Sequence, residues 1–324
     1  ARLLRGEPIL PSLDRPKHLL VIDEASMIDL PTMYRIVTHL DPSVRIILTG
    51  DPNQLPPIGC GKVLSDIVES GAIANVELDI VKRQEDSTGI PEYSKSINHG
   101  DIPKKLTTGS ITFHDTPPEQ LVATCKSLYA QSPRNSQMLG STKALVAELN
   151  EQSQSLINPY GQRLQFLFHG EEFYLDLREG DRILFTKNNY SLNIQNGSLG
   201  VLTSTETATN EDQVSYGAVT LDTGEVIAIT EEVLECMELG YAITLHKAQG
   251  SQFPRVVVAL QKGRIADRAW LYTAITRAQV EIHIVGSARD FESATRWISN
   301  ANRRRSYLVE LLQSEHKSRD GVKA

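Results

Sequence analysis

Cysteine is scarce in this sequence, and the three that occur, Cys60, Cys125 and Cys236, form no C-x-x-C pair. We therefore expect neither a disulfide framework nor a zinc site, and the composition is typical of a reducing cytoplasm. No apolar run approaches the roughly 20 residues of a membrane-spanning helix, and no signal peptide is visible. An excess of basic residues is missing too, because the net charge is −7. That balance argues against a passive nucleic-acid coat but leaves room for a local basic groove.

Short apolar runs alternate with segments of helical spacing along most of the chain. The length of 324 residues and a hydrophobic content of 40% allow a sizeable core and two or three domains. Continuous β-branched runs predict parallel strands buried on both faces, so we expect α/β architecture. The predicted strands are 19–22, 44–48, 255–260 and 281–285, and the predicted helices include 30–40 and 142–157.

Residues 166–236 break this alternation. Asn196-Gly197 and the Asp-Thr-Gly at 222–224 are hairpin turn signals, and strands are expected at 181–185, 217–221 and 225–229. We therefore predict a small all-β insert within the second α/β domain. From Arg303 onward the sequence is polar, which predicts a tail with a frayed end.

Acidic and amide side chains follow the first two apolar runs. Asp23 and Glu24 would lie at the carboxyl edge of a parallel sheet, where ligands bind. Asp23 is a candidate ligand for Mg²⁺, directly or through water, and Glu24 could polarise an attacking water. The rigid turn at 50–57 carries Asp51 and Gln54, whose amide could sense a γ-phosphate. The alternatives are a solvated acidic turn and an ordinary surface turn.

Asp-Glu-Ala-Ser at 23–26 and Gly-Asp-x-x-Gln-Leu-Pro-Pro at 50–57 resemble motifs II and III of superfamily-one helicases. The resemblance is greatest to the RecD-like 5′-to-3′ branch, which includes the alpha subunit of exodeoxyribonuclease V. Four later segments resemble further parts of that family in the same order, so that the likeness covers roughly residues 18–290. They are 81–84 (motif IV), 139–150 (a strand-to-helix segment), 240–252 (motif V) and 271–278 (motif VI).

The resemblance implies roles for individual residues. Arg83 and Arg277 would face the transferring phosphoryl group of ATP, with Arg277 as the arginine finger, while Gly250 and Gln252 would approach the nucleotide. A lone Arg is otherwise a solvated charge or half of a weak ion pair, and a lone His is most often structural. A polar loop closing a small barrel is the alternative for the candidates in the insert. The implied DNA contacts are Thr142, Asn150, Lys187, Asn188, Tyr190, Thr244, His246 and Lys247.

The fold implied by this resemblance is two RecA-like P-loop NTPase domains, the first incomplete, with an SH3-like β-barrel inserted in the second. Residues 1–78 would form the partial first domain. The second would comprise 79–165 and 237–324, and the insert 166–236. ATP would bridge the two domains and favour their closure.

One part of the family pattern is missing. The sequence contains no G-x-x-x-x-G-K-[ST] loop, whose amides and lysine bind phosphates. Its Gly61-Lys62 pair lacks the required preceding strand and glycine. Only 22 residues precede Asp23, and the first is Ala1. We therefore expect a piece truncated before motif II that does not hydrolyse ATP by itself.

The expected function of the intact protein is that of an ATP-dependent helicase or translocase, using Mg²⁺ and moving 5′-to-3′ on single-stranded DNA in recombination and repair. Nuclease and scaffold subunits of an exodeoxyribonuclease V complex are the implied protein partners. Two alternatives stay open: a catalytically silent module that binds single-stranded DNA within a larger repair complex, and an RNA helicase of the same superfamily. ATP turnover separates the first, and preference for a strand with 2′-hydroxyls separates the second.

Overall fold

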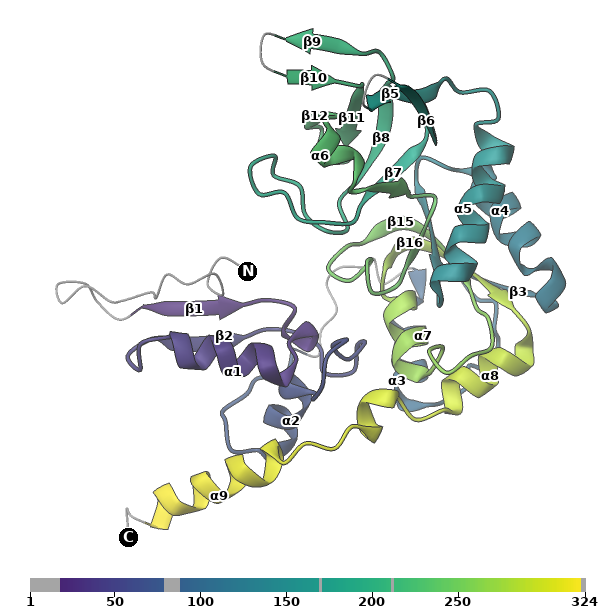
Figure 1. The fold of residues 1–324 in the computed structure, drawn as a ribbon. Coiled ribbons are helices and arrows are strands. Elements are labelled where there is room, and N and C mark those ends of the chain that lie inside the picture. Colours follow the sequence, from purple (N-terminus) through teal and green to yellow (C-terminus); the bar gives the residue numbers. More distant parts are fainter. Residues whose placement is uncertain (1–17, 79–87, 169–170, 211–212, 322–324) are drawn as a thin grey trace.

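The computed structural model describes residues 18–78, 88–168, 171–210 and 213–321 (Figure 1). Every helix in these ranges is too short or too polar to span a lipid bilayer. The helices are α1 (Leu30–His39), α2 (Val63–Ser70), α3 (Ile90–His99), α4 (Leu121–Gln131), α5 (Lys143–Ile157), α6 (Glu231–Leu234), α7 (Arg268–Ile275), α8 (Ala288–Arg296) and α9 (Leu308–Gly321), with 3₁₀ turns at Ala25–Met27, Pro118–Gln120 and Asn300–Arg303.

The strands form a short parallel pair, a larger parallel sheet and an antiparallel insert. Their bounds are β1 (Leu19–Ile22), β2 (Arg45–Leu48), β3 (Ile111–Asp115), β4 (Ser136–Gly140), β5 (Arg163–Phe168), β6 (Glu171–Arg178), β7 (Arg182–Phe185), β8 (Leu199–Ser204), β9 (Ala208–Asn210), β10 (Gln213–Ser215), β11 (Ala218–Leu221), β12 (Val226–Ala228), β13 (Met237–Leu239), β14 (Ala242–Thr244), β15 (Phe253–Ala259) and β16 (Ala278–Gly286).

The first unit is built on β1 and β2, which pair in parallel with Leu19 opposite Arg45. The expected strand runs and the helix after the first strand are confirmed, because β1, β2 and α1 lie where the apolar patterns place them. The prediction that both faces of these strands are buried is wrong for this pair. Leu19, Val21 and Ile47 are 54%, 55% and 46% exposed. Their neighbours along each strand are only half-buried, so one apolar face of this two-stranded sheet is open to solvent.

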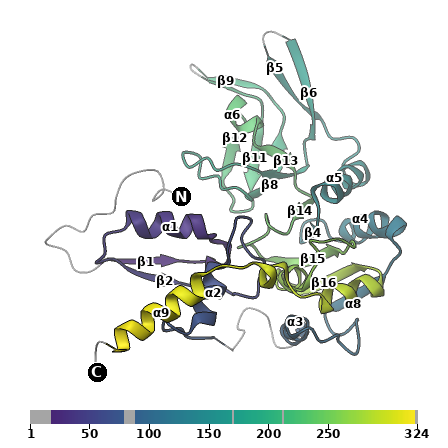
Figure 2. The same ribbon diagram turned by 60° about the horizontal axis from the view of Figure 1, so that its bottom comes forward.

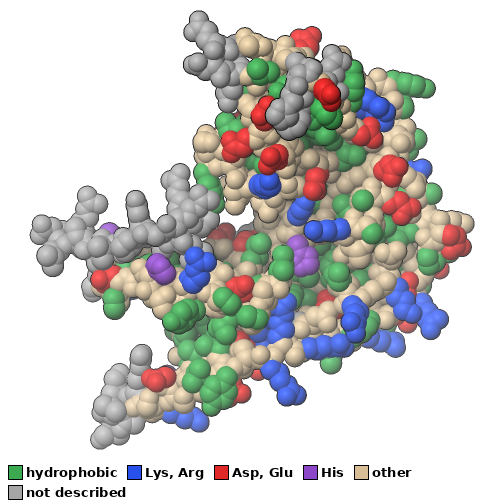
Figure 3. All heavy atoms as spheres, in the orientation of Figure 1, with side chains coloured by type: hydrophobic (Ala, Val, Ile, Leu, Met, Phe, Trp, Pro, Cys, Tyr) green, Lys and Arg blue, Asp and Glu red, His purple; other side chains and the backbone are tan. Residues whose placement is uncertain are grey.

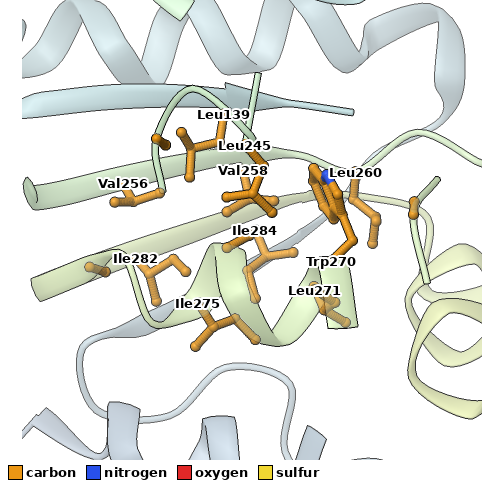
Figure 4. Packing of buried hydrophobic residues seen from close by; sticks show 14 of the residues in the cluster. Leu139, Leu245, Val256, Val258, Leu260, Trp270, Leu271, Ile275, Ile282 and Ile284 are labelled. Atoms are coloured by element: carbon orange, nitrogen blue, oxygen red, sulfur yellow. The ribbon is translucent and has the colours of Figure 1, made fainter. Parts of the chain in front are cut away.

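The second unit has a parallel sheet in the order β14-β4-β15-β16-β3. Successive residues of β15 point to opposite faces. Val256 and Val258 pack with residues of α3, α7 and α8, whereas Val257 and Ala259 pack with residues of α4 and α5. Figure 2 shows the helices on both sides of the sheet, and Figure 4 shows the side chains that fill the first of these cores. The expected parallel sheet covered by helices is therefore confirmed here.

The insert is antiparallel throughout its described strands. Its main sheet has the order β12-β11-β8-β7-β13, and β5 pairs with β6 and β9 with β10 in separate hairpins. The turn at 222–224 joins β11 to β12, where Leu221 N donates to Glu225 O at 2.8 Å. A core of its own, including Ile183, Phe185 and Leu202, holds these strands together. The antiparallel strands run from Arg163 to Leu239, so they extend three residues beyond the expected range at each end.

The polar tail after Arg303 has defined structure as far as Gly321, and the end that the sequence predicts to be frayed lies outside the described residues. Residues 308–321 form α9, which packs against α2 of the first unit (Figure 1). Arg304 Nη1 donates to the Gly59 and Gly61 carbonyl oxygens at 2.6 Å and 2.9 Å. Gln313 Nε2 donates to the Ser70 carbonyl oxygen at 3.3 Å. The chain therefore crosses from the second unit back to the first, and we call residues 297–307 the crossing segment.

A buried polar network joins three strands of the second unit. The Arg255 guanidinium donates to the Leu128 carbonyl oxygen (2.8 Å), to Glu281 Oε2 (3.1 Å) and to His283 Nε2 (2.8 Å). His283 Nε2 also lies 2.9 Å from Glu281 Oε1, and its Nδ1 lies 3.0 Å from His114 Nε2. Burial lowers the pKa of both histidines, and the Arg255 charge lowers both further, whereas Glu281 opposes the shift at His283.

This network predicts a loss of stability in acid. An unfolded histidine titrates near pH 6.5, so below that value the unfolded chain takes up protons that these two folded histidines do not. The free energy of unfolding should therefore fall as the pH drops below about 6.5. His114→Gln keeps a hydrogen-bonding side chain but removes one of the titrating groups, so it should lose less melting temperature between about pH 7.5 and about pH 5.5. His39→Gln, on the exposed side of α1, is the control, and equal losses in the two variants would contradict this origin.

Candidate functional site

The two acidic residues after β1 lie at its carboxyl end, as the sequence predicts. Asp23 is exposed, and its Oδ1 accepts hydrogen bonds from Glu24 N at 2.9 Å and Thr49 Oγ1 at 2.5 Å. Glu24 has φ 52°, in the left-handed region that non-glycine residues seldom occupy. A Cβ on Gly50 would lie 3.0 Å from Ala25 N, so only glycine lets the β2 loop pack this closely. The turn therefore holds Glu24 in a strained backbone conformation of the kind found at functional sites.

The donors at this turn suit Mg²⁺. Magnesium is usually held by one or two carboxylates and keeps water or phosphate oxygens as its other ligands. Asp23 supplies one exposed carboxylate, and Thr49 places a hydroxyl beside it. In the part of the chain that the structure describes, no group of three or more His, Cys, Asp or Glu could enclose a metal. A magnesium ion bound to Asp23 would complete its coordination with water or phosphate oxygens.

The loop after β2 docks on α7 of the second unit. The Tyr272 hydroxyl donates to Asp51 Oδ2 at 2.7 Å, and Leu55 N donates to Thr273 Oγ1 at 2.9 Å. Gln249 Nε2 adds a bond to the Leu55 carbonyl oxygen at 3.4 Å. Burial, and then the Asp51 carboxylate, raise the pKa of Tyr272 well above its ordinary value, which keeps the hydroxyl protonated as a donor. Asp51 thus connects the two units.

Gln54 and Arg277 meet at the same seam. Arg277 Nη2 donates to Gln54 Oε1 at 3.2 Å, Nη1 donates to the Ser251 carbonyl oxygen at 3.2 Å, and Nε donates to the Thr273 carbonyl oxygen at 3.3 Å. Arg277 is only 2% exposed. Its guanidinium is therefore oriented by two segments of its own unit and directed at an amide of the other.

Two of the other residues expected to approach the nucleotide, Gly250 and Gln252, lie close to Arg277. Gly250 is exposed and has φ +79°, which glycine adopts readily. Gln252 Oε1 accepts from Gln279 Nε2 at 3.4 Å. Both residues flank Ser251, whose carbonyl oxygen accepts from Arg277. Arg83 and the rest of the expected motif IV lie outside the described residues.

Two of the residues expected to contact the DNA strand lie at the carboxyl ends of neighbouring β-strands. Thr244 ends β14, and it pairs with Gly140 of β4, two residues before Thr142. The Thr142 side chain accepts from Leu145 N at 3.2 Å and so caps α5. The Thr244 carbonyl oxygen accepts from Lys247 N at 2.9 Å, which bends the following residues into a turn. The sheet thus brings these two hydroxyl side chains to one edge.

The turn after β14 carries His246 and Lys247. His246 is half-buried, and burial, followed by the charge of Arg304, lowers its pKa. A neutral imidazole at this position can still donate or accept a hydrogen bond. Lys247 Nζ lies 3.1 Å from Glu238 Oε2 in a partly exposed ion pair. Both side chains are therefore close to surface charges of their own chain.

Asn150 does not join this group. Its Nδ2 donates to the Ala242 carbonyl oxygen at 3.0 Å, and its Oδ1 accepts from Ala242 N at 2.8 Å. The residue is buried, and both ends of its amide are occupied by the β14 backbone. Its position fits a role in fixing β14 against α5, so we leave it out of the proposed DNA contacts.

The candidate residues of the insert lie on one loop that approaches the β14 turn. A Cβ on Gly197 would lie 3.0 Å from the Lys247 carbonyl oxygen, so this loop packs closely on that turn. Asn188 Oδ1 accepts from Asn196 N at 2.8 Å, which closes the loop. Lys187 is exposed beside Glu235, and Tyr190 is 37% exposed. The insert thereby adds polar and aromatic side chains beside Lys247.

Tyr272, Thr273 and Arg304 were not among the expected site residues. The first two lie inside the segment 271–278 already singled out, but nothing local shows that their hydroxyls reach another unit. Arg304 was assigned to a tail, and only the long-range path of the chain places it beside Gly59 and Gly61.

Comparison with known proteins gives two family matches. A model described as an AAA domain matches residues 2–115, and a model described as a UvrD-like helicase C-terminal domain matches residues 239–285. The first range contains Asp23, Glu24 and Gln54, and the second contains Arg277 and the β14 turn.

Curated relatives match most of this chain but only part of their own length. The RecBCD enzyme subunit RecD of Mycolicibacterium smegmatis is 29% identical over 299 residues, covering 86% of this chain and 52% of that protein. The ATP-dependent RecD2 DNA helicase of Deinococcus radiodurans is 30% identical over 292 residues, covering 86% of this chain and 38% of that protein. The chain thus spans about half, or less, of these relatives.

Solved structures show a similar fold. The Pif1 helicase from Bacteroides in complex with ADP-AlF3 and ssDNA matches with a TM-score of 0.57 and 21% identity, covering 98% of this chain and 83% of that chain. The Pif1 helicase from Candida albicans matches with a TM-score of 0.58 and 15% identity, covering 93% and 77%. The α/β units with their antiparallel insert therefore have a Pif1-like fold. In sequence, the chain is a distant homologue of the RecD-type superfamily-one helicases.

Proposed function

We propose that this chain is the motor region of an ATP-dependent DNA helicase or translocase of RecD type, which moves 5′-to-3′ on single-stranded DNA in recombination and repair. The observation that carries the proposal is the 3.2 Å contact between Gln54 and Arg277, because it joins the two units. Asp23 and Glu24 directly follow β1, which pairs with the strand that leads to Gln54. The direction of movement rests on the likeness to RecD-type proteins.

The proposed chemistry assigns one task to each side chain. Asp23 would hold Mg²⁺, which supplies charge neutralisation at the phosphates when bound. Glu24 would orient the attacking water and accept its proton. Gln54 would hold the water or the γ-phosphate, and Arg277 would stabilise charge on the phosphoryl group. Arg83 stays a predicted second cation.

The same segment that reaches the nucleotide side also reaches the proposed DNA side. Thr244 begins the turn that carries His246 and Lys247, and the chain then runs to Gly250 and Ser251 beside Arg277. These eight residues offer a short covalent path from the phosphoryl group to the strand. We propose that closing of the two units shifts the strand contacts of Thr142, Thr244, His246, Lys247 and the insert residues Lys187, Asn188 and Tyr190.

The partners follow from the same proposal. Single-stranded DNA is the proposed substrate, and the likeness to a RecBCD subunit supports nuclease and scaffold subunits as protein partners. A preference for strands with 2′-hydroxyls would instead favour the RNA helicase alternative.

These 324 residues should not hydrolyse ATP by themselves. The sequence contains no phosphate-binding loop, and each charge-assisted bond that such a loop makes is worth roughly 1.5–3 kcal/mol. A steady-state ATPase assay with excess oligonucleotide measures this. Turnover near 1 s⁻¹ or above, within the ordinary enzyme range, would show that the assignment of an incomplete motor is wrong. Strand binding without turnover is the behaviour expected of the silent module.

Glu24→Gln should separate nucleotide binding from hydrolysis in a longer protein that contains these residues together with a phosphate-binding loop. The amide is nearly isosteric but cannot take a proton from water, so ATP should bind and remain uncleaved. Nucleotide affinity and turnover are measured on the same preparation. Glu69→Gln, which changes an exposed carboxylate of α2 in the same way, is the control, and normal turnover in Glu24→Gln would refute the assigned role.

Arg277→Lys in the intact protein should lower kcat by roughly 10³-fold or more, the low end for arginine fingers. A Lys ammonium cannot reproduce the planar fork that reaches Gln54 and faces phosphate oxygens together. ATP affinity should change far less, and strand affinity without nucleotide should hardly change. Because Arg277 is buried, a structural role is the rival, and it predicts a lower melting temperature with near-normal kcat. Measuring both on one preparation decides between them.

A further inference from the structure

Residues 296–307 carry four arginines and no carboxylate, in a chain of net charge −7. Arg296, Arg303 and Arg305 are exposed, and so is Arg264 on a neighbouring loop. Among the described residues, none of these four has a carboxylate oxygen within 4.0 Å. Figure 3 shows blue side chains gathered over α8 and the segment that leads to α9. Like charges left together without counter-charges indicate a surface that an anion covers.

Hydrogen bonds hold the two segments of this surface together. Asn300 Nδ2 donates to the Arg264 carbonyl oxygen at 2.8 Å, and Asn300 N donates to Asp267 Oδ2 at 2.7 Å. Arg268 Nε donates to the Thr295 carbonyl oxygen at 2.8 Å. Arg264 is therefore fixed beside the residues that follow α8.

Exposed aromatic rings accompany the arginines. The Arg303 guanidinium carbon lies 5.5 Å from the centroid of the Trp297 ring, a cation–π contact that orients the guanidinium. Trp297 is 37% exposed and Tyr307 is 68% exposed. Cations that can contact phosphates, next to rings on which bases can stack, are the combination used for single-stranded nucleic acid.

The surface continues to the proposed DNA side of the site. Arg304, in the middle of the run, donates to the Gly59 and Gly61 carbonyl oxygens of the first unit. It is also close enough to His246 for its charge to contribute to lowering the pKa of that imidazole. The exposed arginines on either side of Arg304 therefore extend from the turn that follows β14.

We propose that Arg264, Arg296, Arg303 and Arg305, with Trp297 and Tyr307, form a second contact surface for the phosphate backbone of single-stranded DNA. Arg296, Arg303, Arg305 and the two rings follow the last of the helicase-like motifs in the sequence, and Arg264 lies between motifs V and VI. The proposal rests on the proposed function, because it lengthens the strand path that begins at Thr244 and His246. A strand held there would contact both the second unit and the crossing segment that leads to α9.

The test is strand binding by the 324-residue chain without nucleotide, using oligodeoxythymidines of increasing length and a range of salt concentrations. The variant is the triple change Arg264→Gln, Arg296→Gln and Arg303→Gln. The control is the equal charge change Arg45→Gln, Arg134→Gln and Lys317→Gln, at exposed positions on β2, the loop before β4 and α9. Melting temperatures of both triple variants are measured first to establish that they fold.

We expect the first variant to bind long oligonucleotides at least roughly tenfold more weakly at low salt, with the slope of log K against log salt reduced by about 2, for three lost phosphate contacts. The shortest oligonucleotides should bind equally, because they occupy only the contacts near β14. Arg303→Lys, which keeps the charge, should retain most of the affinity.

Equal losses in the first variant and the control would overturn the surface. So would a loss confined to duplex DNA or to RNA, and so would a wild-type chain with no affinity for single strands. The motor assignment is tested by a different measurement, ATP turnover in the intact protein. Normal strand binding with the expected length dependence, but no ATP turnover in the intact protein, would refute the motor and leave this surface in place.

Discussion

The seam between the loop after β2 and helix α7 is the contact on which the rest of the candidate site depends. Tyr272, Thr273 and Arg277 donate or accept toward Asp51, Leu55 and Gln54. These three residues lie within six consecutive positions, at the end of α7 and just after it, so the loop binds one continuous surface. Any ligand that moves this loop relative to β1 also moves the carboxylates relative to Arg277. The seam therefore converts a change at one unit into a change at both.

The strands and most helices are predictable from the sequence because their apolar spacing is local. β15 alternates between two helix layers, and the continuous apolar run at 255–260 is what such burial requires. The same reasoning fails at β1 and β2, where Leu19 and Val21 remain exposed. A run of apolar residues indicates that a β-strand can be buried. Whether it is buried depends on the elements that pack against it.

In the candidate site too, the sequence predicts the features that depend on neighbouring residues but not the contacts between distant ones. Asp23 and Glu24 could be placed because a strand end fixes them, whereas the bond between Gln54 and Arg277 joins residues 223 positions apart. At Asn150, local sequence information suggests a DNA contact that the structure does not favour. Its residue type and spacing fit a contact with a DNA strand, but both ends of its amide are hydrogen-bonded to the backbone of Ala242. Hydrogen-bond partners of that kind depend on which strand lies beside the helix, and spacing along one segment does not contain that information.

The crossing segment adds a second constraint to the same loop. Arg304 donates to the carbonyl oxygens of Gly59 and Gly61. These follow by a few residues Gln54 and Leu55, which Arg277 and Thr273 of the second unit already bind. The chain thus passes from the first unit to the second and returns, with α9 packed on α2. Opening the seam without disturbing Arg304 would need the loop to stretch between its two attachments. Because Gly59 is five positions after Gln54, that stretch is limited to under roughly 20 Å. A separation of the two units must therefore either break the Arg304 bonds to Gly59 and Gly61 or carry Arg304 along with the first unit.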